Sequence, residues 1–264
     1  KSIHIENLLE KTKNDYEAVL FQLLAYNFGL KINASIFEAI AENIEFNIIR
    51  KISRNQIQLE SLLLGKAGFL IEEFDETATI WKKEYHFLKT KFNLNDVEFK
   101  PQFSKLRPAN FPTIRLSQLS NLYHQHTSLF SEIIEAKDYS TLISIFNNIK
   151  ASPYWDHHFQ IGKISEQNHP KILTKEFIHL LLINTILPIQ YTYFKNTESN
   201  VIEDILHIYQ NIPVEKNRIV DEWKSLKIKI KNSVESQSLL YHYKNYCLEK
   251  KCLNCSIGLQ ILKP

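Results

Sequence analysis

Three cysteines, all that the chain contains, lie within nine residues near the end of the sequence. Cys247, Cys252 and Cys255 follow the pattern C-x4-C-x2-C. Thiolates are preferred ligands of Zn²⁺ and of iron–sulfur clusters, and both usually need four ligands. His242 is the candidate fourth ligand, but on a continuous α-helix its offset from Cys247 points it partly away, so the helix must bend. The spacing predicts a zinc or iron–sulfur site, with redox-active thiols or thiols packed as small apolar groups as alternatives.

A second group of polar side chains lies in the run Tyr154-Trp155-Asp156-His157-His158-Phe159. An aspartate beside histidines can act as a general base or bind a metal. An Asp-His-His string occurs in one class of phosphoesterases, where further acidic motifs follow strands, and such motifs are absent here. Asp156 and His158 are therefore a candidate polar site. The alternative is an aromatic loop in which the aspartate caps the backbone.

The charged residues are unevenly distributed. The whole chain has a net charge of +3, whereas residues 216–264 contain ten Lys and Arg against four Asp and Glu. A basic tail on a mildly acidic body is typical of proteins that bind nucleic acid or another polyanion, although a solvated lysine face has the same composition. Arg107 and Arg115 flank a run with two prolines, and the alternative for these two arginines is a structural role in that rigid turn. The candidate phosphate-binding residues are Arg107, Arg115, Lys224, Lys227, Lys229, Lys231, Lys250 and Lys251.

Several catalytic classes are excluded by the motifs they need. The sequence has no G-x4-GK[ST] phosphate loop, no G-x-S-x-G nucleophile elbow and no H-E-x-x-H zinc helix. We therefore predict no catalytic residue, and this chain alone is not expected to be an enzyme.

The elements that must position these residues are predicted to be helices, because most of the chain repeats its apolar residues with a period near 3.6. Residues 226–231 alternate apolar residues with lysines and give the one hint of a strand. We predict an all-α protein, an irregular multi-helix bundle over residues 1–200 with a smaller basic helical subdomain over residues 201–264 that carries the cysteines. The predicted helices are Asn14–Phe28, Ala34–Glu42, Arg54–Leu64, Asp75–Phe92, Thr113–His124, Ser128–Ala136, Tyr139–Ile149, Thr174–Leu187, Val201–Gln210, Glu215–Leu226 and Ser233–Lys250.

The most apolar segment is predicted to be a buried core helix rather than a membrane span. Phe177–Ile189 is interrupted by His179, Asn184 and Pro188 and is shorter than the roughly 20 residues that a span needs. No signal peptide is visible, and three cysteines are too few for a disulfide framework. We therefore expect a cytoplasmic protein that does not bind membranes.

The run Arg107-Pro108-Ala109-Asn110-Phe111-Pro112-Thr113-Ile114-Arg115-Leu116 resembles the hallmark of an uncharacterised bacterial family, domain of unknown function 2851, found chiefly in Bacteroidetes. The closing run from Tyr246 to Gly258 is similar to its C-terminal signature. The chain thus resembles the C-terminal portion of that family. Further stretches that agree in character and order are Leu23–Gly29, Glu60–Gly68, Tyr154–Phe159 and Asn184–Pro188.

The resemblance implies a further N-terminal portion whose Gly-Pro-Asp and Glu-Ile-His segments suggest a nuclease-like core. The leading hypothesis is then an accessory module that binds nucleic acid. The second is a scaffold without catalysis that packs against a protein partner or against that N-terminal portion. The third is a metal-binding or redox protein that uses the cysteine cluster with Zn or an iron–sulfur centre.

Overall fold

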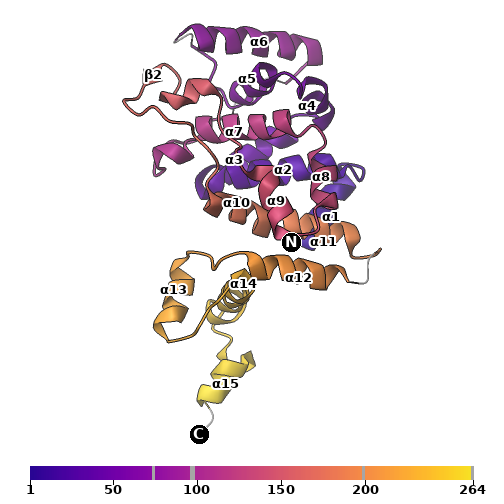
Figure 1. The fold of residues 1–264 in the computed structure, drawn as a ribbon, viewed down its shortest axis with the longest axis vertical. Helices are drawn as coiled ribbons and strands as arrows, with labels where there is room; N and C mark the ends of the chain where they lie inside the picture. The colour runs from indigo at the N-terminus through magenta and orange to yellow at the C-terminus, as the bar shows by residue number, and fades with distance from the viewer. Residues whose placement is uncertain (73–74, 96–98, 198–199, 263–264) are drawn as a thin grey trace. The chain divides into compact units, whose positions relative to one another are not determined.

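The computed structural model describes residues 1–72, 75–95, 99–197 and 200–262. Helices dominate these residues, and the strands found among them form one two-stranded sheet (Figure 1). This confirms the prediction of an all-α fold. The chain divides into unit 1, Lys1–Phe194, and unit 2, Lys195–Pro264, whereas the sequence pattern placed the boundary after residue 200.

Unit 1 contains most of the helices and the small sheet, in which His158 of one strand faces Ile164 of the other. Helices α1 and α4 were not predicted, and α4 is only two turns long, too short for a 3.6-residue period to show. The elements are α1 (Ser2–Lys11), α2 (Tyr16–Phe28), α3 (Leu30–Glu42), α4 (Phe46–Ile52), α5 (Gln56–Lys66), α6 (Glu76–Phe92), the 3-10 turn η1 (Pro108–Asn110), α7 (Pro112–Gln125), α8 (Leu129–Glu135), α9 (Tyr139–Phe146), the 3-10 turn η2 (Pro153–Asp156), β1 (His158–Gln160), β2 (Lys163–Ile164), α10 (Lys175–Leu181), the π-helix η3 (Leu182–Ile186) and α11 (Leu187–Phe194).

Short polar side chains begin several of these helices. Asp15, Asn55 and Asp75 each accept a hydrogen bond from the backbone N–H three residues further on, at 3.0, 3.1 and 2.8 Å. Asp138 and Thr174 do the same at the starts of α9 and α10. Each bond satisfies a backbone donor that has no partner within the first helical turn, so these residues fix where the helices start.

Helix α7 lies in the interior of unit 1. All its residues from Pro112 to Tyr123 are buried, and it packs against both α5 and α2. Because seven of them carry polar side chains, counting the hydroxyl of Tyr123, α7 needs partners inside the protein. Gln118 Nε2 and Asn121 Nδ2 supply such bonds, each donating to a backbone carbonyl, of Lys171 and Lys150, at 2.7 Å. These amides tie the two connecting segments to the central helix.

Glu60 of α5 places a carboxyl group inside unit 1. Its side chain accepts hydrogen bonds from Ser152 Oγ at 2.9 Å and from Trp155 Nε1 at 2.7 Å. Ser117 of α7 also hydrogen-bonds this carboxyl group, and its Oγ accepts the backbone N–H of Ser152 at 2.9 Å. Burial raises the pKa of Glu60, and the three hydrogen bonds act in the opposite direction. One carboxyl group therefore joins α5, α7 and η2.

Elements α10, η3 and α11 form one continuous helix, Lys175–Phe194, that changes register near its middle. The N–H of Leu187 bonds the carbonyl of Leu182, five residues earlier, in π-helical register. The next bond of that register would run from residue 188 to Ile183, but Pro188 has no N–H to donate. Lys1 Nζ instead donates to the Ile183 carbonyl at 2.8 Å and to Asn184 Oδ1 at 2.8 Å. The register change thus accommodates the proline.

This helix is long and apolar enough, by length and composition alone, to cross a membrane, with a mean hydropathy of 1.3. The sequence predicted a shorter apolar segment, because polar residues interrupt it. Of its most apolar window, 61% is buried inside the structure. Helix α10 and η3 pack on α2, and α11 packs on α1. These contacts match the predicted core helix.

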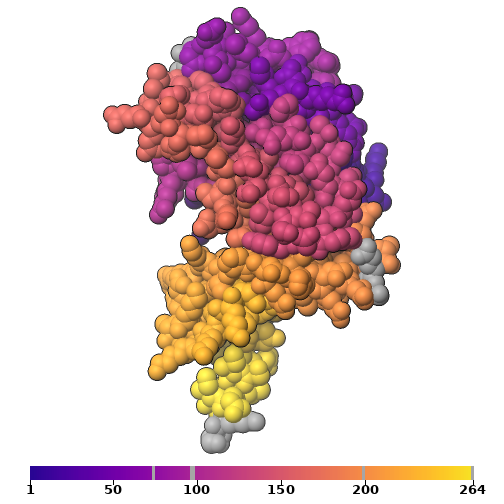
Figure 2. Space-filling view, viewed as in Figure 1, coloured from indigo at the N-terminus to yellow at the C-terminus, as the bar shows by residue number. Residues whose placement is uncertain are grey.

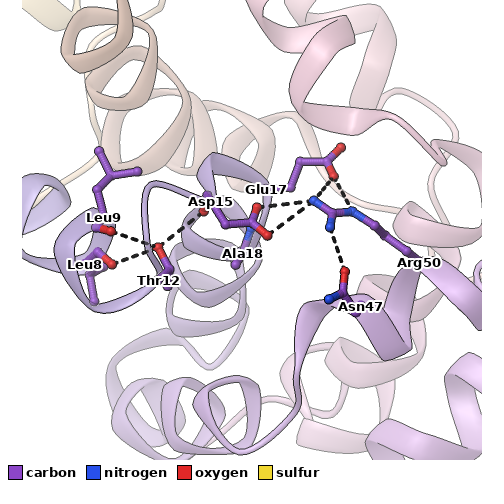
Figure 3. A network of polar contacts seen from close by, with 8 residues as sticks. All are labelled: Leu8, Leu9, Thr12, Asp15, Glu17, Ala18, Asn47 and Arg50. Carbon is purple, nitrogen blue, oxygen red and sulfur yellow. Dashed lines mark hydrogen bonds and ion pairs between the residues drawn. The ribbon is translucent and has the colours of Figure 1, made fainter.

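Arg50 of α4 links that short helix to the start of α2 (Figure 3). Its guanidinium lies 2.7 Å from Glu17 Oε2 and 3.3 Å from Asp15 Oδ1, and it donates to Asn47 Oδ1 at 2.8 Å. Asp15 meanwhile caps α2 through the N–H of Ala18. The Arg50 side chain is 40% exposed, so these ion pairs contribute little stability and mainly set the position of α4.

Unit 2 is built around α14, which packs against both α12 and α13. Ser233, buried at the start of α14, donates through its N–H to the Ile212 carbonyl at 2.9 Å and through Oγ to the Tyr209 carbonyl at 2.7 Å. The hint of a strand over residues 226–231 was wrong, because the chain there turns and continues without a ladder. The elements are α12 (Val201–Asn211), α13 (Arg218–Ser225), α14 (Ser233–His242), the π-helix η4 (Tyr243–Cys247), the 3-10 turn η5 (Cys252–Asn254) and α15 (Ser256–Leu262).

The Glu60 junction gives a prediction about stability. Glu60→Ala should lower the free energy of unfolding by about 2–4 kcal/mol, because the buried donors of Ser152 and Trp155 lose their acceptor and a cavity remains. Glu60→Gln keeps an acceptor and the volume, and should cost far less. Urea unfolding followed by circular dichroism measures both.

The same variants test the pKa of Glu60. Because burial raises that pKa above 4.5, the folded protein binds the proton more tightly than the unfolded chain does. Wild-type stability should therefore fall as the pH rises from 4.5 through the folded-state pKa, and Glu60→Gln should lack this part of the slope. If the stability of the two proteins depended on pH in the same way, burial would not raise the pKa of Glu60.

Candidate functional site

The two arginines of the proline-containing run lie in different environments. Arg107 is exposed just before η1, whereas Arg115 is 6% exposed within α7. Arg115 donates to Asn110 Oδ1 at 2.6 Å and to Gln118 Oε1 at 2.9 Å. Its guanidinium carbon lies 3.8 Å from the ring centre of Phe177. The expectation that Arg115 contacts phosphate is therefore wrong, because the guanidinium is buried and both of its terminal nitrogens already have hydrogen-bond partners.

Arg115 instead has a structural role. Burial lowers its pKa to about 10, since the charged guanidinium has lost water. Its partners are two amide oxygens and an aromatic ring, none of which carries a charge. Through Asn110 it fixes η1 to α7, and through Gln118 it continues to the carbonyl of Lys171. The spacing of arginines and prolines in the sequence did not indicate these partners.

Asp156 and His158 do not form the predicted acid–base pair. The Asp156 backbone carbonyl accepts a hydrogen bond from Lys171 Nζ at 2.9 Å. His158 Nδ1 lies 2.8 Å from the Tyr154 carbonyl, and its ring stacks on the Tyr154 ring with centres 4.0 Å apart. The carboxylate whose charge is coupled to His158 belongs to Asp75, at the start of α6.

The structure thus shows a polar contact that sequence reasoning missed. The Tyr154 hydroxyl donates to Asp75 Oδ2 at 2.6 Å and accepts the N–H of Gly162 at 2.9 Å. Burial and the neighbouring carboxylate raise the pKa of Tyr154. Burial alone would raise the pKa of Asp75, but hydrogen bonds from Tyr154 and the backbone lower it below its usual value. With Trp155 stacked on Trp81, these contacts hold η2 against α6.

The lysines of unit 2 lie on its surface. Lys227, Lys229 and Lys231 are all exposed, in a stretch between α13 and α14 that has no regular secondary structure beyond the turn at its start. Lys227 has a φ of 65°, a left-handed conformation that ends α13. Lys250 and Lys251 are exposed between η4 and η5. Lys224 is exposed as well but lies 3.9 Å from Asp221.

The three cysteines and His242 line one pocket of about 180 Å³ in unit 2. Cys255 is buried and its Sγ lies 3.3 Å from His242 Nε2, whereas Cys247 and Cys252 are exposed. Burial, with the nearby thiols of Cys255 and Cys252, raises the pKa of Cys247. Within the described part of the chain, no three His, Cys, Asp or Glu side chains already stand close enough to hold a metal ion.

A pocket of about 460 Å³ in unit 1 was not anticipated from the sequence. Asp15, Glu42, Glu45, Phe21 and Phe46 contribute to its walls, next to the Arg50 contacts of Figure 3. Lys11 also contributes to its lining, and the Arg50 guanidinium carbon lies 4.9 Å from the centre of the Phe46 ring, so cations of the chain itself already meet the carboxylates and rings. The residues come from separate helices, and no local motif links them.

The family model described as "Protein of unknown function (DUF2851)" matches residues 1–218. The chain belongs to this family. No curated protein and no solved structure matches the chain.

The family match corrects part of the sequence-based expectation. We expected the chain to correspond to a C-terminal portion of the family, with a family signature in its closing run. The match instead begins at the first residue and ends at Arg218, so it covers all of unit 1 and α12. Residues 219–264, which include the cysteine cluster and all six candidate lysines, lie outside it.

The contrast between the two arginines can be tested by stability. Arg115→Ala should lower the free energy of unfolding by about 2–4 kcal/mol, because it leaves a cavity and two amide oxygens without their donor. Arg107→Ala should stay within about 0.5 kcal/mol of the wild type, because the side chain is exposed. Chemical denaturation of the two variants in parallel measures both. Equal losses would mean that Arg115 is not the structural residue.

Proposed function

We propose that unit 2 binds the phosphates of nucleic acid, as an accessory module without catalysis of its own. The observation that carries the proposal is the exposed lysine segment formed by Lys227, Lys229 and Lys231. Polyanion binding is driven largely by the counterions released when ammonium groups neutralise phosphates. Three lysines within five residues, with no acidic residue among them, concentrate that effect in one short segment.

The environment of this segment supports the proposal. Elsewhere in unit 2, Arg218 pairs with Glu222 at 3.0 Å and Lys224 lies 3.9 Å from Asp221. In the described part of the chain, no ion pair of the three segment lysines is found. Their charges therefore remain available to an external anion.

The small net charge of unit 2 limits the expected strength of binding. Unit 2 contains eleven Lys and Arg and eight Asp and Glu, a net charge of +3, and unit 1 is neutral with 21 of each. The excess of positive charge is thus confined to the part of unit 2 that follows residue 215. Binding should accordingly be weak and strongly dependent on salt.

A second candidate function is docking of a protein partner through the end of unit 2. Leu253 is 72% exposed, Ile261 75% and Leu262 58%. Exposed apolar side chains that gather in one segment are typical of interaction surfaces. This candidate needs no phosphate contacts, so salt dependence separates the two.

The test is fluorescence anisotropy of labelled single- and double-stranded DNA and RNA, titrated with the protein at several salt concentrations. We expect micromolar binding that weakens steeply with salt. Replacing Lys227, Lys229 and Lys231 together with Gln should reduce the slope of log affinity against log salt by about 2–3, because each phosphate contact contributes about 0.7 on single strands and 0.9 on duplex DNA.

A matched control removes the same charge elsewhere. Lys31, Lys83 and Lys163 are exposed and scattered over unit 1, and their joint replacement with Gln should leave the slope nearly unchanged. An equal change in both triple variants would show a non-specific charge effect. No binding at low salt would overturn the proposal and favour a protein partner.

A further inference from the structure

The end of unit 2 has very few buried side chains. Among residues 246–262, Cys255 alone is buried, and apolar residues such as Leu253 and Ile257 remain exposed. In the space-filling view these residues form a narrow projection, shown in yellow (Figure 2). A seven-residue helix such as α15 is not stable on its own, and small elements without a core usually need a disulfide or a metal. Something other than apolar burial must therefore hold this segment.

The π-helix η4 removes the geometric objection to a shared site for His242 and Cys247. In an α-helix, residues five apart lie roughly 140° apart around the axis. From Tyr243 to Cys247 the register widens, and Leu248 N–H bonds the Tyr243 carbonyl five residues back at 2.9 Å. Residues five apart then lie on nearly the same side of the helix, and local π-helices are common at functional sites. This change of helical register, rather than a bend, lets His242 and Cys247 face the same site.

The remaining two cysteines are presented by a compact turn. Cys252 is the first residue of the 3-10 turn η5, and Cys255 comes directly after the turn. The Cys255 N–H donates to the Cys252 carbonyl at 3.2 Å. Gly258 N–H points at Cys255 Sγ from 3.4 Å. A Cβ at Gly258 would lie 2.3 Å from the Cys252 carbonyl oxygen, so only glycine lets α15 pack this closely on the turn.

His242 is held in place beside this turn. Its ring stacks on Tyr246 with centres 5.0 Å apart and meets Trp223 edge-on at 6.2 Å. Its Nε2 already lies 3.3 Å from Cys255 Sγ. The aromatic rings also line the pocket, whose lining is apolar apart from the sulfur and imidazole groups. An apolar shell lowers the local dielectric around the ligands and so favours the binding of a cation by thiolates.

We propose that Cys247, Cys252, Cys255 and His242 bind one Zn²⁺ ion, which fixes the last part of unit 2. Three thiolates and one imidazole form a standard tetrahedral zinc ligand set. The buried Cys255 already lies next to His242, and the exposed side chains of Cys247 and Cys252 line the same pocket. Zinc binding deprotonates the thiols and releases their protons to solvent, without any redox change.

The first experiment measures the metal in protein produced without an affinity tag and purified without chelators. We expect one zinc per chain by elemental analysis, and three thiols that react with a thiol reagent only after a strong chelator is added. Replacing zinc with Co²⁺ should give the intense visible absorption of tetrahedral cobalt and a thiolate charge-transfer band. Metal-free protein that is folded, with three freely reactive thiols and no cobalt bands, would overturn the proposal.

Matched variants assign the ligands. His242→Ala and Cys252→Ser should each reduce the bound zinc well below one per chain, whereas His207→Ala, which changes an exposed histidine of the same unit, should retain it. Stoichiometric iron, or a mass lower by two hydrogens that signals a disulfide, would also overturn the zinc assignment.

A second measurement avoids variants that fail to fold. Lys250 and Lys251 lie exposed between the proposed ligands and are trypsin sites. In the wild-type protein, chelation should accelerate cleavage there by at least tenfold, while cleavage within unit 1 stays constant. An unchanged rate would show that no metal orders the segment. Because metal content and proteolysis are measured without nucleic acid, this result is independent of the proposed phosphate binding.

Discussion

A polar helix in the interior of unit 1 must find a partner for each buried side chain, because an unsatisfied buried donor or acceptor costs about 1–3 kcal/mol. Helix α7 meets this constraint for most of its polar side chains through contacts distant in sequence, although Arg115 Nε and the Tyr123 hydroxyl are buried without a hydrogen-bond partner among the described residues. Ser117 bonds the Glu60 carboxyl group, and Gln118 and Asn121 bond backbone carbonyls of the segments around residues 171 and 150. The connecting segments therefore cannot take arbitrary paths, and the position of η2, with its stacked aromatic rings, follows from them.

The two units are stabilised in different ways. Unit 1 buries long apolar side chains from most of its helices, and its buried charges, such as Glu60 and Arg115, are enclosed by hydrogen bonds and rings. Unit 2 buries little beyond α14 and its neighbours, and its closing segment buries only Cys255. The exposed lysine segment and the thiol pocket both belong to the unit with the smaller core. In that unit, binding of an ion or an anion can contribute a large part of the order.

The candidate site could be predicted only in part. The clustering of Cys247, Cys252 and Cys255 in sequence indicated a shared environment, and the structure places them with His242 around one pocket. The π-helix between His242 and Cys247 could not be predicted, because its register depends on contacts within unit 2. Arg115 failed as a phosphate ligand for a similar reason: it is buried and packs on Phe177 of α10, a residue distant in sequence.

The sequence by itself determined the all-α class, the starts of helices capped by Asp15, Asn55, Asp75 and Asp138, and the exclusion of several catalytic motifs. These depend on apolar periodicity and on side chains that bond the backbone within three residues, which are local properties. Tertiary structure decided which polar residues are buried, that Asp75 rather than Asp156 is the carboxylate near His158, and that α7 lies in the interior. Those outcomes depend on contacts between residues far apart in the chain, whose energies no local pattern contains.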